Sequence, residues 1–263
     1  MTPRLLSFLA IVAIAAPAHS QAVTGEARTS LLTAARAQYY NLRFQGLKSF
    51  SCNVAIDWDS IFTQATGAPL PADNPIMAYL LKTRLGVKET VDSGAEVTWA
   101  NSGTPPDALA QSASQLRGGV KQMLDGFFEA WTPNINGDLF SKGVTSVTAT
   151  NAGYQVEEKS EKNSTDTLTF DKNMLLGHIS STSPEVLAEI DTKYSPTPQG
   201  LLVSSFDADY RQPVSAPPTH VTMTTDYQTV EGFQLPNTIV LSVRNVATFK
   251  LKLTGCTVEK LPK

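Results

Sequence analysis

The amino-acid sequence predicts an α+β fold built around a large antiparallel β-sheet. From residue 143 onward, short β-branched and aromatic segments alternate with turn residues at even spacing. Short links of this kind join antiparallel strands, because parallel strands need long crossover connections. The first half of the chain instead mixes single strands with segments of helical periodicity. We therefore expect a long antiparallel meander preceded by a region of helices and a few strands.

The first 20 residues have the organisation of a cleavable signal peptide. Arg4 is the only early charge, an apolar run covers residues 5–16, and small residues precede a cut after Ser20. The run is too short for a membrane-spanning helix, which needs about 20 apolar residues. The sequence thus predicts a periplasmic or secreted protein that is not an integral membrane protein, with residues 21–263 forming a single β-rich domain.

The charge balance argues against nucleic acid as a partner. The chain carries 21 Lys and Arg against 24 Asp and Glu, whereas proteins that bind nucleic acid concentrate basic residues to neutralise phosphates. With 41% hydrophobic residues over this length, the chain can bury a sizeable core.

The segment after the predicted cut is expected to form a helix and then a strand. Apolar residues at helical spacing predict an amphipathic helix over residues 30–45, ended by Gly46 in a left-handed conformation. Strict alternation over residues 50–58 then predicts a strand with one buried face. Cys52 lies on that buried face.

A short helix, a hairpin and the longest helix are expected next. Asn74-Pro75 supplies an N-cap and a first-turn proline. Two short strands follow at 87–91 and 96–100, and apolar residues then share one helical stripe over 106–131. Gly118-Gly119 interrupts this stripe, which indicates either close approach of the helix to a sheet or a hinge.

The remainder of the chain is expected to form nine strands. Their connectors contain Asn, Asp, Gly and Pro, the residues that favour turns. The predicted strands cover residues 144–150, 154–159, 165–170, 174–180, 186–194, 201–210, 220–227, 238–244 and 248–258.

Cys52 and Cys256 are the only cysteines, and they are either two buried thiols or a disulfide. Export favours the disulfide, because oxidising compartments preserve such bonds. In the last predicted strand Cys256 falls out of phase with the apolar face, but a bulge at Thr254-Gly255 would return it to the buried side. The sequence therefore predicts a disulfide that joins the first and last strands.

Residues for catalysis are scarce. Beyond the signal peptide the only histidines are His178 and His220, and a single histidine on a strand is more often a surface or satisfied side chain than a base. Motifs for acyl-transfer hydrolases, zinc proteases, dithiol oxidoreductases and P-loop proteins are missing from the sequence. We expect no catalytic residue, no metal ligand and no cofactor.

Two carboxylate pairs keep a hydrolase as an alternative. Asp57/Asp59 and Asp207/Asp209 lie beside aromatic residues, an arrangement that a glycosidase could use. The favoured interpretation of both pairs is the solvent face of an alternating strand. Asn163-Ser164-Thr165 fits an N-glycosylation acceptor and also fits a plain turn.

The remaining candidates are apolar and aromatic side chains. They either fill a core, or they line a cavity that the 106–131 helix leaves as it crosses a curved sheet. Such a cavity would suit an acyl chain. The candidate cavity residues are Trp58, Trp99, Leu116, Val120, Met123, Phe127 and Trp131.

Two segments carry a resemblance to a known family. The entry Gly46-Leu47-Lys48-Ser49-Phe50 into the first strand and the meander segment Tyr227-x-x-Val230-x-Gly232-Phe233-x-Leu235-Pro236 resemble the periplasmic lipoprotein-carrier superfamily, the LolA, LolB and RseB group. The resemblance implies a curved half-barrel with helices over its concave face and a hydrophobic cavity for acyl groups.

This resemblance makes non-enzymatic binding of an acyl chain, a lipoprotein or a similar amphiphile the leading hypothesis. An envelope regulatory module of the same fold, which binds another envelope protein, is the second hypothesis. A hydrolase that uses carboxylates such as Asp57 or Asp207 is the third.

Overall fold

The structure, a computed structural model, describes residues 20–262 apart from 72, 101–102, 111–112, 141–142 and 160–162. The predicted signal peptide therefore lies outside the described residues, except for Ser20.

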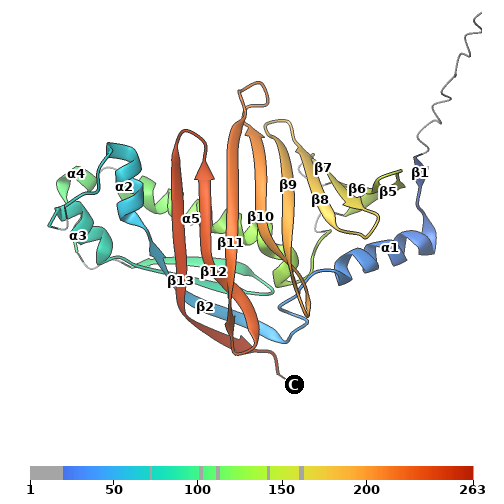
Figure 1. Cartoon of the computed structure of the whole chain (residues 1–263), viewed down its shortest axis with the longest axis horizontal. Helices are drawn as coiled ribbons and strands as arrows, with labels where there is room; N and C mark the ends of the chain where they lie inside the picture. The colour runs from blue at the N-terminus through green and yellow to red at the C-terminus, as the bar shows by residue number, and fades with distance from the viewer. Residues whose placement is uncertain are drawn as a thin grey trace, which may run out of the picture.

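The strands of the described residues form one open sheet of 13 strands (Figure 1). The order along the sheet is β1-β5-β6-β7-β8-β9-β10-β11-β12-β13-β2-β3-β4. Its two edges are β1 (Gln21–Ala22) and β4 (Gly94–Ala100). All neighbouring strands pair antiparallel. The prediction of an α+β chain dominated by a large antiparallel sheet is confirmed.

Nine consecutive strands of this sheet are also consecutive in the chain, as the turn pattern predicted. They begin after residue 143 and pair with their chain neighbours throughout. These strands are β5 (Val144–Ala149), β6 (Gly153–Lys159), β7 (Thr165–Asp171), β8 (Leu176–Thr182), β9 (Leu187–Thr197), β10 (Gly200–Arg211), β11 (Thr219–Val230), β12 (Phe233–Val243) and β13 (Ala247–Lys260).

The first long strand, β2 (Leu47–Ile56), pairs with the last strand, β13, and β3 (Arg84–Thr90) follows β2 in the sheet. The β2–β13 register shifts between Thr254 and Thr257, which is the predicted bulge. Within this bulge Cys256 packs against the buried core and forms a disulfide with Cys52, with the two Cα atoms 4.1 Å apart. The predicted disulfide is confirmed.

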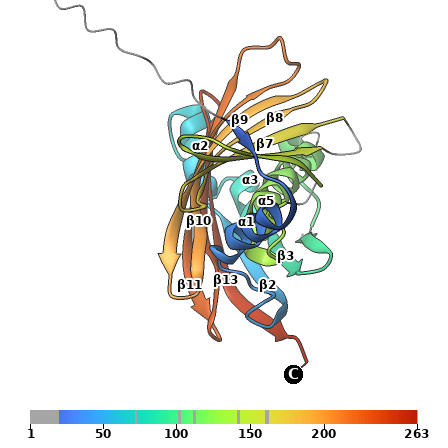
Figure 2. The same ribbon diagram turned by 90° about the vertical axis from the view of Figure 1, so that its right-hand side faces the viewer.

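Five helices accompany the sheet in the described residues. They are α1 (Gly25–Ala37), α2 (Trp58–Thr66), α3 (Pro75–Leu81), α4 (Asp107–Ala110) and α5 (Ala113–Ile135). Asn74 caps α3 as predicted, because its side chain accepts a hydrogen bond from the Ile76 amide at 2.9 Å. Figure 2 shows α1 and α5 on the same side of strands β10, β11 and β13.

Apolar side chains between the sheet and the helices form two clusters. The larger one joins α2, α3, α4 and α5 to β2, β3 and β10–β13, with Trp131 of α5 near its centre. The smaller one joins α1 to β5, β6, β7 and β8, with Phe140 and Phe170 in ring contact.

The first helix was predicted at 30–45, which overlaps the observed helix but begins and ends too late. It begins at Gly25 and ends at Ala37. The following backbone turns away and pairs with distant elements. The Tyr40 amide donates to the Leu201 carbonyl at 3.0 Å, and the Leu42 amide donates to the Asn134 backbone carbonyl at 3.0 Å. Gly46 does adopt a left-handed conformation, but at the end of this turn and not at a helix end.

The alternation over residues 50–58 was also extended too far. The strand ends at Ile56, and Trp58 begins α2. The cause is local, because the Asp57 side chain accepts a hydrogen bond from the Ser60 amide at 3.1 Å and so caps the helix. Asp57 and Asp59 therefore belong to a helix start and not to a strand face.

The longest predicted helix, 106–131, appears as α4 and α5, and residues 111–112 between them lie outside the described residues. Close approach of Gly118-Gly119 to the sheet is wrong. Both glycines are exposed, and a Cβ added at either would meet nothing within 4 Å. A hinge at this position stays a prediction.

Candidate functional site

Helix α5 is the element around which the candidate sites are arranged. Its apolar stripe buries Val120, Leu124, Phe127, Phe128 and Trp131. The Trp131 ring centroid lies 6.2 Å from those of Phe50 and Tyr227 and 6.1 Å from that of Phe127. The middle of the helix is thus packed solidly, and open space occurs along its two flanks.

The seven residues predicted to line a cavity occupy different environments. Val120, Phe127 and Trp131 are buried in the larger core, and Leu116 packs half-buried against it. Trp58 and Trp99 line a pocket of about 160 Å³ near α2 and α3. Met123 and Phe127 line a different cavity on one flank of α5.

The cavity that includes Met123 and Phe127 is an apolar groove of about 460 Å³ between α5 and strands β10–β12, here called the α5 groove. The sheet provides its apolar floor, and the helix provides one wall. Polar side chains occur mainly along the helix rim, from Gln122, Asp125 and Glu129. The floor is formed by Phe206, Tyr210, Val221, Met223, Ile239 and Leu241.

Strand alternation explains why these side chains gather. Phe206 pairs with Met223 across β10 and β11, and Met223 pairs with Leu241 across β11 and β12, so the three form one row on the helix side. On α5, Gly126 leaves part of the wall bare, because a Cβ added there would meet nothing within 4 Å.

Tyr210 closes one end of the floor with a polar group. Burial raises the pKa of its phenol, and the nearby Glu129 carboxylate raises it further. The hydroxyl therefore stays neutral at physiological pH and can donate a hydrogen bond to a ligand group at that end.

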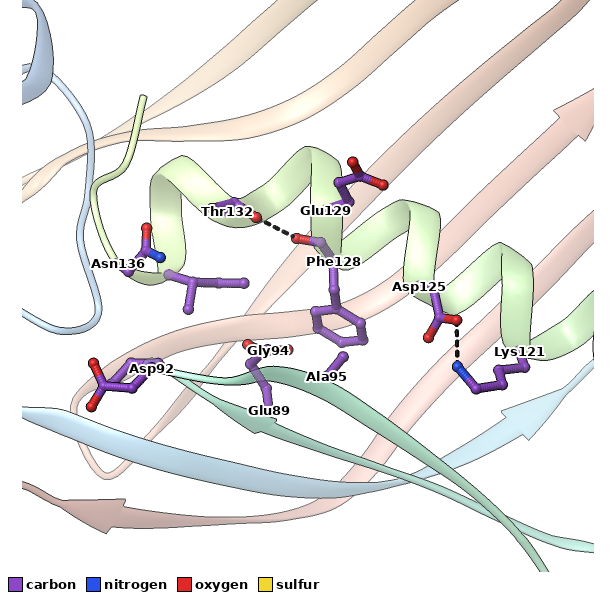
Figure 3. A pocket seen from close by; sticks show the side chains of 12 residues that line it. Glu89, Asp92, Gly94, Ala95, Lys121, Asp125, Phe128, Glu129, Thr132 and Asn136 are labelled. Atoms are coloured by element: carbon purple, nitrogen blue, oxygen red, sulfur yellow. Dashed lines mark hydrogen bonds and ion pairs between the residues drawn. The ribbon is translucent and has the colours of Figure 1, made fainter. Parts of the chain in front are cut away.

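The second cavity, on the other flank of α5, is an acidic pocket of about 410 Å³ between α5 and the β3–β4 hairpin (Figure 3). Glu89 of β3 lies at its base and is only 1% exposed. Neither of its carboxylate oxygens has a hydrogen-bond partner among the described residues. Burial raises the pKa of Glu89 to about 8.

The other charged side chains of the acidic pocket are partly compensated. Asp92 pairs with Arg43 at 2.9 Å, and Asp125 pairs with Lys121 at 2.5 Å. Glu129 adds a further carboxylate. Figure 3 shows the Phe128 ring above Glu89, between the helix and the hairpin.

Glu89 was missed from the sequence, although a signal exists. Leu85, Val87, Glu89 and Val91 alternate with exposed or half-buried residues, so a strand pattern puts this carboxyl on the face of three apolar side chains. A charged residue in phase with buried neighbours is the feature that could have identified it.

Comparison with protein-family models, curated proteins and solved structures found no match to this chain. Within the described residues, no helix combines the length and the apolar character that a membrane crossing requires. The two cavities beside α5 are thus defined by their geometry alone.

The carboxylates suggested for a hydrolase do not meet at one site. Asp57 caps α2, whereas Asp207 and Asp209 lie on the exposed face of β10, beside His220. His178 is likewise held between two carboxylates on that face. In the part of the chain that the structure describes, no group of three or more His, Cys, Asp or Glu side chains is placed to hold a metal ion.

Proposed function

We propose that the chain is an exported, non-enzymatic binding protein that takes the acyl chain of a lipid, a lipoprotein or a similar amphiphile into the α5 groove. In this proposal the sheet is a curved half-barrel with helices over its concave face, and it holds the acyl chain in the way that the resemblance to the lipoprotein-carrier group implies. The observation that carries the proposal is the groove itself, an apolar space beside a helix whose centre is already fully packed.

The size and lining of the groove support this ligand class. A volume of about 460 Å³ lies within the range of about 300–1,000 Å³ that small-molecule sites occupy. Each buried methylene contributes about 0.8 kcal/mol, so a chain laid along the row Phe206, Met223 and Leu241 would gain most of its affinity from length. Polar groups at the helix rim and at Tyr210 would contact the head group.

A groove-filling substitution tests the proposal. Val221 is half-buried on the groove side of β11, and its neighbour Thr222 lies on the opposite face. We expect Val221→Trp to weaken binding of a fluorescent fatty acyl probe at least about tenfold, because the indole would occupy the space of the chain. Thr222→Trp places the same ring on the other face of the same strand and should leave binding unchanged.

Probe binding by the two variants, together with any lipid that copurifies with the protein, tests whether the α5 groove holds an acyl chain. Native mass spectrometry of the protein from an envelope fraction should show bound lipid, displaced in the Val221→Trp variant. Equal probe binding by wild type and Val221→Trp, or no binding by either, would reject the proposal. Crosslinking that recovers one specific protein in place of lipid would support the regulatory-module alternative.

A further inference from the structure

We infer that the acidic pocket is a second binding site, which takes a small protonated organic amine whose ammonium group pairs with Glu89. This site lies on the other flank of α5 from the α5 groove and shares only Asp125 and Glu129 of the helix with it. It does not depend on the function proposed for that groove.

The state of Glu89 is the first step of the argument. Its side chain is 1% exposed, and both oxygens lack a hydrogen-bond partner in the described residues. Buried polar groups are nearly always paired, because an unpaired one loses its hydration without compensation. In Figure 3 the side chain extends from β3 toward α5, into the pocket that it lines. A ligand entering this pocket would supply the partner that the protein does not.

The charges around Glu89 select a cationic ligand. Asp92, Asp125 and Glu129 also line the pocket, and Lys121 is the only basic side chain in its lining. Lys121 is already paired with Asp125. An anion would meet an excess of carboxylates, whereas an ammonium group would gain charge-assisted hydrogen bonds.

The remaining lining selects an organic cation over a metal ion. Phe128, Ala95, Val91 and Ile135 present apolar surface around the carboxyl, and such side chains offer no metal ligands. An alkyl segment attached to the ammonium would pack against this surface, and the Phe128 ring can also attract a nearby cation.

The protonation state of Glu89 gives the proposal a specific signature. Because burial raises its pKa to about 8, the carboxyl is mostly protonated at neutral pH and must release its proton to pair with an ammonium. Binding is therefore expected to release close to one proton per ligand and to tighten as the pH rises toward about 8.

Isothermal titration calorimetry with n-hexylamine tests the site, with hexanoate and 1-hexanol as probes of the same chain length. We expect hexylamine to bind with an enthalpy that varies with the ionisation enthalpy of the buffer, and the other two probes to bind at least about tenfold more weakly. Glu89→Gln removes the charge at constant shape and should weaken hexylamine binding at least tenfold. Glu96→Gln, on the exposed face of the same hairpin, should have no effect.

Three results would overturn the inference: no binding of hexylamine, equal binding by wild type and Glu89→Gln, or equal binding of hexanol. Circular dichroism of Glu89→Gln confirms that the variant is folded before its affinity is compared. The groove variant Val221→Trp should still bind hexylamine, so failure of this site and failure of the α5 groove give different patterns.

Discussion

Asp191 of β9 lies directly opposite Asp207 of β10, and the next exposed pair on the same two strands, Glu189 opposite Asp209, is also doubly acidic. Like charges directly opposite each other destabilise a sheet. Two histidines from the flanking strands offset this repulsion. His178 of β8 contacts Asp191 at 2.8 Å and Glu189 at 2.9 Å.

His220 of β11 brackets the same carboxylates from the other side. Its ring nitrogens lie 3.0 Å from Asp209 and 3.4 Å from Asp207. Four carboxylates on two strands are therefore held between two imidazoles on the face of the sheet that is opposite the α5 groove.

The first prediction concerns the pH dependence of this cluster. The hydrogen bond to Asp191, followed by that to Glu189, raises the pKa of His178 above its ordinary value of 6.5. The pKa of His178 is higher in the folded state than in the unfolded state. Protonated His178 therefore stabilises the folded state fully below about pH 6.5, and this stabilisation is lost as the pH rises through the folded-state pKa.

His178→Asn should therefore lower the free energy of unfolding near pH 5.5, by less than about 1 kcal/mol because the pair is partly exposed. The free energies of unfolding of wild type and His178→Asn should become equal near pH 9. Urea unfolding at both pH values measures the difference, and about 1 M salt should reduce it. A difference that is constant with pH would mean that the charge of His178 contributes nothing.

The second prediction concerns the disulfide. Cys52 and Cys256 are 204 residues apart, so the bond restricts most of the unfolded chain. In the chain-entropy model a loop of this length contributes up to about 5 kcal/mol. Reduction, or the double change Cys52→Ala and Cys256→Ala, should lower the melting temperature by up to about 10–20 °C. Identical melts of oxidised and reduced protein would contradict this.

Much of this fold could be predicted because its determinants are local. The segment Tyr227 to Pro236 forms the β11–β12 hairpin, with Glu231 and Gly232 at positive φ of 49° and 93° in its turn. Asn74 caps its helix, and Thr254-Gly255 forms the bulge that brings Cys256 to the core side. In each case the residues that decide the geometry lie within a few positions of one another.

The parts that could not be predicted depend on partners far away in the sequence. Helix α1 ends early because Tyr40 pairs with Leu201, which no local pattern reveals. The predicted cavity residues were chosen by helical phase alone, and phase does not tell Trp131, which is packed in the core, from Met123, which lines the groove. That distinction depends on which strand side chains face each turn of α5.

The third prediction concerns Glu89 in the ligand-free protein. Its pKa rises from an ordinary value of 4.5 to about 8 on folding, because burial disfavours the charged form. The folded state keeps a proton that the unfolded state releases, so Glu89 reduces stability progressively between about pH 4.5 and pH 8. At about 1.4 kcal/mol per pH unit, the upper limit of this loss is about 5 kcal/mol.

Glu89→Gln should remove this loss. The variant should match wild type near pH 4.5 and exceed its free energy of unfolding by several kcal/mol near pH 8.5. Urea unfolding across this range measures the effect, and Glu96→Gln serves as the exposed control on the same hairpin. If the free energies of unfolding of wild type and Glu89→Gln changed in parallel with pH, the Glu89 carboxyl would not be desolvated.

The fourth prediction concerns Asn134, whose side chain is 0% exposed and joins three chain segments. Its amide nitrogen donates to the carbonyls of Tyr40 and Leu201, both at 2.9 Å, and its amide oxygen accepts from the Val203 amide at 3.1 Å. The C-terminal end of α5 is thereby fixed to β10, so this residue sets the position of the helix that both candidate sites share.

Asn134→Ala would leave those three backbone groups without their side-chain partner. The Leu201 carbonyl keeps its bond from the Tyr40 amide, so two groups, the Tyr40 carbonyl and the Val203 amide, are orphaned. Each orphaned group costs about 1–3 kcal/mol, so we expect a loss of at least about 2 kcal/mol in the free energy of unfolding. Asn136→Ala is the matched control, because among the described residues the Asn136 side chain accepts one exposed hydrogen bond, from the Asp138 amide at 2.8 Å. Asn136→Ala should lower the free energy of unfolding by less than about 1 kcal/mol. Equal losses in the two variants would show that the Asn134 contacts do not hold α5 in place.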